Sequence, residues 1–379
     1  MKYRLSLILL VVLNTKVYSF SLIKSERSPK SYYEVRRVLN KYKVQKLEKN
    51  LRSFVKACRP SRMAGSVGHK NAAPFLINFL KGVDSENSGI LSIDSFTPNT
   101  EASKRMYQED FQKEIIGKYA PGSDVYQKWE RFTTSMIDEL SHLKMQKGKN
   151  IIWEKKGTIN PEQVLILGAH YDTIAFNKKS LKILKDSAQP GADNNGSGVS
   201  ILLSMIEVLS EIDLPKTVRI VFFDMEEFGF LGSRAYISKY GEELKKVSGY
   251  LNLLMLGHDS KIMDKLKRRG NMKAYIRKES DPSFGQDKKL VDIFVKSGSQ
   301  VEYGVKFQVE KNSFNSSGHT LFWQHGVPSV VFSQDWENDY NAKRHHSAND
   351  FVETLNIKTL ENSFRYLTGG VISWAFDLR

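Results

Sequence analysis

The stretch "VRIVFFDMEEFGFLGS", residues 218–233, joins a largely apolar run to three acidic residues. An apolar run of this kind is typical of a strand that is buried on both faces of a sheet. It leads into Asp224, Glu226 and Glu227, although burying a carboxylate is costly unless it is paired or bound to a metal ion. Successive side chains at a strand end point to opposite sides, so Glu226 and Glu227 can have different chemical roles. We expect one to bind a metal ion and the other to face its bound water, because capping of the next helix explains only one acid.

From residue 163 onward, short apolar runs alternate with helix-length segments. The predicted strands are 164–169, 217–223, 250–256 and 329–333, and the predicted helical segments include 197–212 and 360–376. Strands that alternate with helices favour a largely parallel sheet covered on both faces. We therefore predict an α/β fold, a three-layer α/β/α sandwich around a mostly parallel, mixed central sheet. Helices are also expected within 31–84, and the polar stretch of about 85–150 is interpreted as a helical insertion.

The composition is that of a globular protein, since 40% of the 379 residues are hydrophobic. The formal net charge is +15, but the lysines are scattered. Neither zinc-finger cysteines nor a basic helix with interleaved aromatic residues is present, so we expect no nucleic-acid partner. The single cysteine, Cys58, excludes an internal disulfide and is expected to be a small buried thiol.

The N-terminus has the pattern of a secretory signal peptide. Lys2 and Arg4 precede an apolar stretch at 5–13, and Val17 and Ser19 occupy the small-residue positions of a cleavage site. The apolar stretch is too short to span a membrane. We predict a signal peptide at 1–19 that is cut after Ser19, a single mature domain at 20–379, and a secreted or periplasmic protein without a stable membrane anchor. The oligomeric state is left open.

Three further stretches place polar side chains after predicted strands. In "GAHYDT", Asp172 is spaced to bond one imidazole nitrogen of His170 while the other binds a metal, and a surface His–Asp pair is the alternative. Asp193 in "PGADNNGSG" lies in a tight loop before a long apolar helix, as a ligand or as a helix cap. In "RHHSAND", His345 or His346 is a candidate ligand, with a polar loop as the alternative.

Ligand-binding residues in an open α/β sheet gather at the carboxyl ends of the strands, so these side chains are expected to lie together. Mixed imidazole and carboxylate ligation suits zinc. The sequence resembles the secreted zinc aminopeptidases of metallopeptidase family twenty-eight, which are relatives of bacterial leucyl aminopeptidase and of the glutaminyl cyclases. Six stretches carry the resemblance, in the family's order: "RMAGSVG", "GAHYDT", "GADNNGSG", "FFDMEEFGFLGS", "GHTLFWQHGVPSVVF" and "HHSANDFVETL". The resemblance implies a zinc-exopeptidase-like form of the predicted fold.

The resemblance also implies metal-binding roles. His170 is expected to bind a first zinc, with Asp172 orienting its ring. Asp193 is expected to be the carboxylate that bridges both zincs. Glu227 and His346 are expected to complete the second zinc site.

Two catalytic roles are implied in the same way. Glu226 is expected to be the general base, which takes a proton from metal-bound water and passes it to the leaving amine. His319 is expected to stabilise the oxyanion, with a packed loop histidine as the alternative. Relatives often carry an acid where this chain has Gly318. They also have a cis peptide bond after the bridging aspartate, which here predicts a cis Asp193–Asn194 bond.

Another departure affects the number of metal ions. Leu254 stands where the family has an aspartate ligand, and leucine cannot bind zinc. The first site, which keeps His170, is therefore expected to be weak or empty. One zinc is expected at the second site, bound by Asp193, Glu227 and His346.

The leading interpretation is a secreted zinc-dependent exopeptidase, an aminopeptidase that hydrolyses N-terminal bonds of peptide or protein substrates. A glutaminyl-cyclase-like acyltransferase is one alternative, because the single-zinc ligand set is that of the cyclases. A catalytically silent binding homologue is another, because of Leu254 and Gly318. The basic segment at 258–280 is interpreted as part of the substrate-cleft wall or as a solvated loop.

Overall fold

The computed structural model describes residues 27–83, 89–260 and 270–378. The predicted signal peptide at 1–19 and its cleavage site lie outside the described residues, and so does part of the basic segment at 258–280. Within the described ranges, no helix has both the length and the apolarity needed to cross a membrane.

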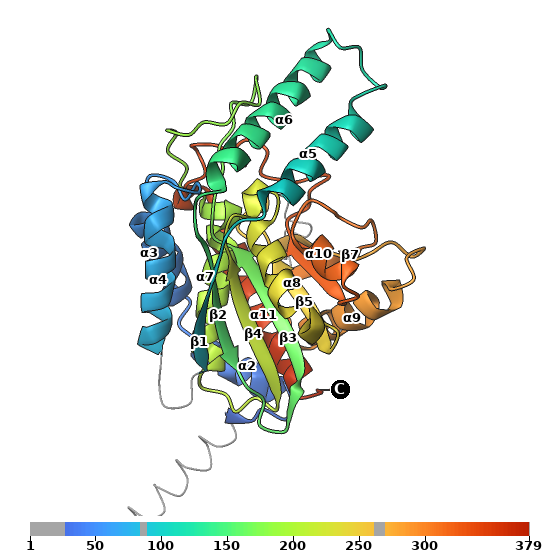
Figure 1. The fold of residues 1–379 in the computed structure, drawn as a ribbon. Helices are drawn as coiled ribbons and strands as arrows, with labels where there is room; N and C mark the ends of the chain where they lie inside the picture. The colour runs from blue at the N-terminus through green and yellow to red at the C-terminus, as the bar shows by residue number, and fades with distance from the viewer. Residues whose placement is uncertain (1–26, 84–88, 261–269, 379) are drawn as a thin grey trace, which may run out of the picture.

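Among the described residues, an eight-stranded sheet forms the centre of the fold, in the order β1-β2-β4-β3-β5-β8-β6-β7 (Figure 1). The strands are β1 Ile90–Phe96, β2 Gly148–Lys155, β3 Asn160–His170, β4 Lys216–Phe223, β5 Val247–Leu253, β6 Gly270–Tyr275, β7 Val305–Glu310 and β8 Ser329–Ser333. The pairs β4–β3, β3–β5, β5–β8 and β6–β7 are parallel, and β1–β2, β2–β4 and β6–β8 are antiparallel. The prediction of a mixed, mostly parallel sheet is confirmed.

Helices cover both faces of this sheet, which confirms the three-layer α/β/α arrangement (Figure 1). The helices are α2 Tyr32–Lys41, α3 Gln45–Ala57, α4 Val67–Val83, α5 Thr100–Glu114, α6 Asp124–Leu143, α7 Gly198–Leu209, α8 Leu231–Leu244, α9 Phe284–Val301, α10 His319–Gln324 and α11 Ile357–Ala375. Three short helices, η1 Ala192–Ser197, η2 Glu226–Phe228 and η3 Val352–Thr354, lie in loops.

The alternation of side chains along β4 explains how the sheet fills two cores. Ile220 and Phe222 belong to the apolar cluster that contains α7 and α11, whereas Val221 and Phe223 belong to the cluster that contains α8 and α10. All four side chains are buried. Burying an aliphatic or aromatic side chain stabilises a fold by about 1.5–3 kcal/mol, so the four consecutive apolar residues at 220–223 favour a central place for β4.

The four predicted strands overlap β3, β4, β5 and β8, with the third extending three residues past the end of β5, whereas β1, β2, β6 and β7 were not predicted. The stretch at about 85–150 is not wholly helical, because β1 and the start of β2 pair with each other and extend the sheet. β1 is an edge strand with mostly exposed residues, and β7 alternates apolar and polar residues, so neither has the continuous apolar run of a central strand. The helices predicted in this stretch correspond to α5 and α6, which pack as a hairpin.

The parallel strands position the candidate site. β4, β3 and β5 run in the same direction, so their carboxyl ends lie at one end of the sheet. His170 is the last residue of β3, Glu226 and Glu227 follow β4, and Leu254 follows β5. Helix α5 lies over this end, and its side chains form one wall of the cavity there (Figure 1).

Candidate active site

The acidic turn after β4 brings two glutamates into the site. Met225 (φ +52°) and Gly229 (φ +81°) have left-handed backbone on either side of η2. This conformation costs a residue such as methionine about 1–3 kcal/mol, so other contacts must fix the turn. Asp172 provides them, because its Oδ1 accepts the backbone N–H of Glu226 at 3.0 Å and its Oδ2 accepts that of Glu227 at 3.1 Å.

His170 lies beside this turn and is buried. Its Nδ1 is 3.4 Å from Oδ1 of Asp172, which leaves Nε2 for the cavity. Burial by itself would lower the pKa of His170, but the hydrogen bond with Asp172 and the nearby charges of Glu227, Asp172 and Glu226 raise the pKa to about 9. Asp172 therefore both orients His170 and holds the acidic turn.

Glu226 is fixed by three donors on other elements. Its Oε1 accepts hydrogen bonds from Ser317 Oγ at 2.7 Å and from the Gly318 N–H at 2.6 Å, and its Oε2 accepts one from Ser233 Oγ at 3.2 Å. Burial raises the pKa of Glu226, and its contacts with His170, Gly318 and Ser317 oppose that rise. The carboxylate is thus held in one orientation at the cavity floor.

Close packing explains the glycine at position 318. A Cβ atom at Gly318 would lie 2.8 Å and 3.0 Å from the two carboxylate oxygens of Glu226 and 2.5 Å from Ser233 Oγ. The acid that relatives often carry here would therefore collide with Glu226 and place a second negative charge beside it.

Glu227 is bound by two side chains from distant loops. Asn194 Nδ2 donates to Glu227 Oε1 at 2.6 Å, and His346 Nε2 lies 3.1 Å from each carboxylate oxygen. Burial would raise the pKa of Glu227, but the charge and hydrogen bond of His346 outweigh it and lower the pKa to about 2. His346 has left-handed backbone (φ +52°), and its ring stacks on His345 with centroids 3.7 Å apart. The amide, the carboxylate and the imidazole therefore converge on one point.

Asp193, the predicted bridging ligand, does not reach this point. It is fully buried, and it is absent from the cavity lining, which includes the neighbouring Asn194. Its Oδ1 accepts the N–H of Gly257 at 2.9 Å, and its Oδ2 accepts Asn341 Nδ2 at 3.0 Å. Donors behind the site thus occupy the carboxylate of Asp193, and its metal-binding role stays a prediction.

The backbone of this loop is held by Asp350. The carboxylate of Asp350 accepts the N–H of Asp193 at 2.9 Å and that of Asn194 at 2.9 Å. Burial and the charge of Asp193 raise the pKa of Asp350 to about 7. The cis peptide bond of the loop is Asn194–Asn195, one residue later than predicted.

His319 does not line the cavity either. It is the first residue of α10 and fully buried, with its ring stacked on Phe314 and edge-on to Trp323. Its Nε2 donates to the carbonyl oxygen of Phe314 at 2.6 Å, and burial lowers the pKa of His319 to about 3. The ring is thus neutral, and its one N–H is already bonded. This placement fits the packed-histidine alternative, and the oxyanion role of His319 stays a prediction.

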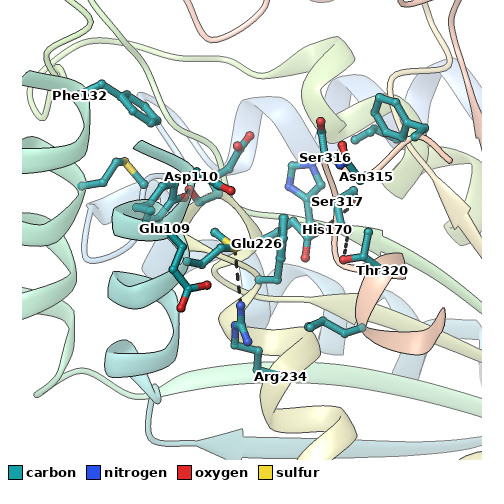
Figure 2. A pocket seen from close by; sticks show the side chains of 18 of the residues that line it. Glu109, Asp110, Phe132, His170, Glu226, Arg234, Asn315, Ser316, Ser317 and Thr320 are labelled. Carbon is teal, nitrogen blue, oxygen red and sulfur yellow. Dashed lines mark hydrogen bonds between the residues drawn. The ribbon is translucent and has the colours of Figure 1, made fainter. Parts of the chain in front are cut away.

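A cavity of about 1070 Å³ lies above these residues. Figure 2 shows His170 and Glu226 at its floor, with Glu109 and Asp110 of α5 on one side and the loop at 315–317 on the other. Much of the remaining wall is apolar and is formed by Met106, Tyr107, Phe132, Met136, Phe176, Phe230, Leu254, Phe314, Leu321 and Trp336. Such a cavity is suited to an organic ligand with an apolar side chain.

The floor residues that could hold a metal ion do not form a complete set of ligands within the residues that the structure describes. In the described parts of the chain, no three His, Cys, Asp or Glu side chains are placed to hold one ion together. Glu227 and His346 are in contact, and the amide of Asn194 supplies a third polar group at the same point. Nitrogen and oxygen ligands of this kind suit zinc. Leu254 lines the same cavity as His170 and packs against Met255, Tyr275 and Val331.

Sequence reasoning missed Asn194 and Ser317 as site residues. Asn194 follows an aspartate in a loop, and no local signal decides which of the two side chains faces the cavity. Ser317 lies in a serine-rich loop at 316–317 whose contact with Glu226 joins residues 91 positions apart. Tyr107 was also missed; it lines the cavity from α5, and its hydroxyl donates to the carbonyl oxygen of Glu227 at 3.3 Å.

Residues 150–369 match the family described as peptidase family M28. The chain belongs to this family. Aminopeptidase YwaD of Bacillus subtilis (strain 168) is 27% identical over 229 residues, which are 60% of this chain and 44% of that protein. The chain spans about half the length of the curated relatives it matches. The family and its aminopeptidase members support a hydrolase of the metallopeptidase type, and the predicted family resemblance is confirmed.

Two solved structures show the same fold. The zinc aminopeptidase BSAP from Bacillus subtilis superposes with a TM-score of 0.60 at 18% identity, covering 87% of this chain and 94% of that chain. The glutaminyl cyclase of an Acidobacteriales bacterium also gives a TM-score of 0.60 at 18% identity, covering 89% of this chain and 95% of that chain. The predicted zinc-exopeptidase-like fold is confirmed.

Proposed function

We propose that this M28 family member is an aminopeptidase-type hydrolase that removes N-terminal residues from peptides or proteins. The observation that carries the proposal is the fixed carboxylate of Glu226 at the floor of the cavity, opposite His170 and next to the Glu227–His346 pair. A zinc ion bound by Glu227 and His346 would polarise the scissile carbonyl and lower the pKa of water.

Glu226 is suited to moving a proton. Its two oxygens are oriented by Ser317, Gly318 and Ser233, and burial raises its pKa toward the working range of a general base. It accepts a proton from the attacking water and donates it to the leaving amine. Asp172 keeps His170 oriented, so that Nε2 of His170 faces the substrate.

The wall of the cavity supports a preference for peptides with a free amino terminus and an apolar first residue. Glu109, Asp110 and Glu114 of α5 line it, and carboxylates of this kind can pair with an ammonium group. The apolar wall, which includes Phe132, Phe176 and Trp336, would cover the first side chain. We also propose export of the protein, on the strength of the signal-peptide pattern at 1–19.

The test is hydrolysis of aminoacyl p-nitroanilides by the full chain, in buffer with zinc and in buffer with a chelator. We expect turnover of leucine p-nitroanilide, little turnover of its N-acetylated form, and inhibition by the chelator. Glu226→Gln should reduce kcat by about 10²–10⁴-fold, since it removes the proton carrier. Glu242→Gln, at an exposed ion pair with Lys245, is the control and should keep full activity.

Absence of turnover in zinc-containing buffer would refute the aminopeptidase proposal and favour the silent binding homologue. Cyclisation of N-terminal glutaminyl peptides without release of amino acids would favour the acyltransferase.

A further inference from the structure

We infer that Arg234 of α8, together with Arg105 of α5, forms a subsite of the cavity that binds a carboxylate of the peptide substrate. This carboxylate is either the C-terminus of a short peptide or the side chain of an acidic residue that follows the first one. The inference rests on the proposed function and deepens it, because it assigns which part of the peptide is recognised beyond the first residue.

The first step is the anchoring of Arg234 beside the acidic turn. Its Nε donates to the carbonyl oxygen of Gly229 at 2.9 Å, and its Nη2 contacts Sδ of Met106 at 3.6 Å. Nη1 has no hydrogen-bond partner among residues 27–83, 89–260 and 270–378. Figure 2 shows the side chain extending from α8 toward the cavity, which it lines. A guanidinium that is held in one plane with an open edge is suited to binding a carboxylate.

The second step is that the charge of Arg234 lacks a close counter-ion. Among the residues that the structure describes, neither Arg234 nor Arg105, which lines the same cavity, has a carboxylate oxygen within 4.0 Å. Arg219, which is also half-buried, is by contrast paired with Glu154 at 2.5 Å. Burial lowers the pKa of Arg234, and the charge of Arg105 acts in the same direction. A bound carboxylate would therefore stabilise both arginines.

The third step is that the acids of the cavity do not neutralise these arginines. Glu109 lies one helical turn from Arg105 and lines the same wall, but in the described part of the chain it forms no ion pair with either arginine. The charge of Glu226 opposes the fall in the pKa of Arg234 without outweighing burial. Both signs of charge thus line the cavity, as the two ends of a zwitterionic peptide require. Because α5 lies outside residues 150–369, the Arg105 half of the subsite does not belong to the family-matched segment.

The last step is the reach from Glu226 to the arginines. Ser233 directly precedes Arg234 in α8 and donates to Oε2 of Glu226 at 3.2 Å, so Glu226 and Arg234 flank the same short segment. An extended peptide advances about 3.5 Å per residue. With its scissile carbonyl at Glu226, a peptide brings a carboxylate one or two residues further on within reach of Arg234. Dipeptides, tripeptides and peptides with an acid directly after the first residue meet this condition.

The experiment is isothermal titration calorimetry on the full chain in buffer with a chelator, in which the proposed hydrolysis stops. The probes are Leu-Ala, Leu-Ala amide and Leu-Glu amide. We expect Leu-Ala to bind about tenfold more tightly than Leu-Ala amide, because the amide cannot form the charge-assisted hydrogen bonds. In Arg234→Gln the two affinities should be nearly equal, and Arg105→Gln should reduce the preference in part. Tight binding of Leu-Glu amide would assign the subsite to an acidic side chain, and weak binding of it would assign the subsite to the C-terminus.

Arg131→Gln is the matched control, because it removes the same charge from an exposed position of α6 outside the cavity lining. It should keep the wild-type preference for Leu-Ala. Each preference is a ratio of two affinities in one protein, so a fraction of unfolded chain does not change it.

Equal binding of Leu-Ala and its amide by the wild type, or no detectable binding of Leu-Ala, would overturn the inference. An unchanged preference in Arg234→Gln, or its loss in Arg131→Gln, would also overturn it. Release of leucine from the same peptides in zinc-containing buffer separates the two proposals. A preference for Leu-Ala in binding without release of leucine would support the inference and refute the aminopeptidase, whereas release of leucine with equal binding of acid and amide would do the reverse.

Discussion

Gly318→Ala tests whether the orientation of Glu226 limits activity. The backbone of Gly318 is right-handed (φ −59°), so alanine causes no backbone strain and acts through its Cβ alone. That atom would lie 2.8 Å from Glu226 Oε2, about 0.6 Å inside the ordinary contact distance of 3.4 Å. It would also lie 2.5 Å from Ser233 Oγ, which restricts the direction in which Glu226 can move.

We expect Glu226 to move by several tenths of an ångström and kcat to fall by about tenfold, because a misplacement of a full 1 Å costs about 10²-fold. The contacts are with side-chain ends, so the free energy of unfolding should fall by only about 1 kcal/mol. Steady-state kinetics on leucine p-nitroanilide and urea denaturation measure the two effects. Gly285→Ala, where a Cβ meets nothing within 4 Å, is the control. A Gly318→Ala protein with kcat within threefold of wild type would refute the reasoning.

Two further predictions concern stability. Arg277 and Asp287 form a buried bidentate ion pair with N–O distances of 2.7 Å. Asp287→Ala would leave the charge of Arg277 buried without its partner, so the free energy of unfolding in urea should fall by about 3–5 kcal/mol. A fall of less than about 1 kcal/mol would contradict the prediction. Burial lowers the pKa of Lys155 to about 8 from its ordinary 10.5. The unfolded chain therefore binds more protons between these two pH values, and the free energy of unfolding should rise with pH in that range. In urea denaturation the rise should be smaller for Lys155→Met than for the wild type, and an equal rise in both proteins would contradict the prediction.

The sequence by itself determined the central fold and part of the site. β3, β4, β5 and β8 each contain a short apolar run, and such runs reflect burial on both faces, which is a local property of the sequence. The paired glutamates after β4 are visible in the same way, because a carboxylate at the end of a buried strand requires a partner. The leucine at position 254 also indicated from sequence alone that one expected ligand is missing.

The edge strands could not be predicted, because β1 is largely exposed and β7 lacks a continuous apolar run. β1 and β7 become strands because each one hydrogen-bonds to the strand beside it, β2 or β6.

Only the tertiary structure decided which side chain of the loop at 193–194 faces the cavity. Asp193 is held behind the site by Gly257 and Asn341, which are 64 and 148 residues away in the sequence. Adjacent residues of a loop have no fixed periodicity, so long-range donors select the one that points inward. Tertiary contacts also decide the orientation of His319. Its ring packs against Phe314 and Trp323 and does not face the cavity.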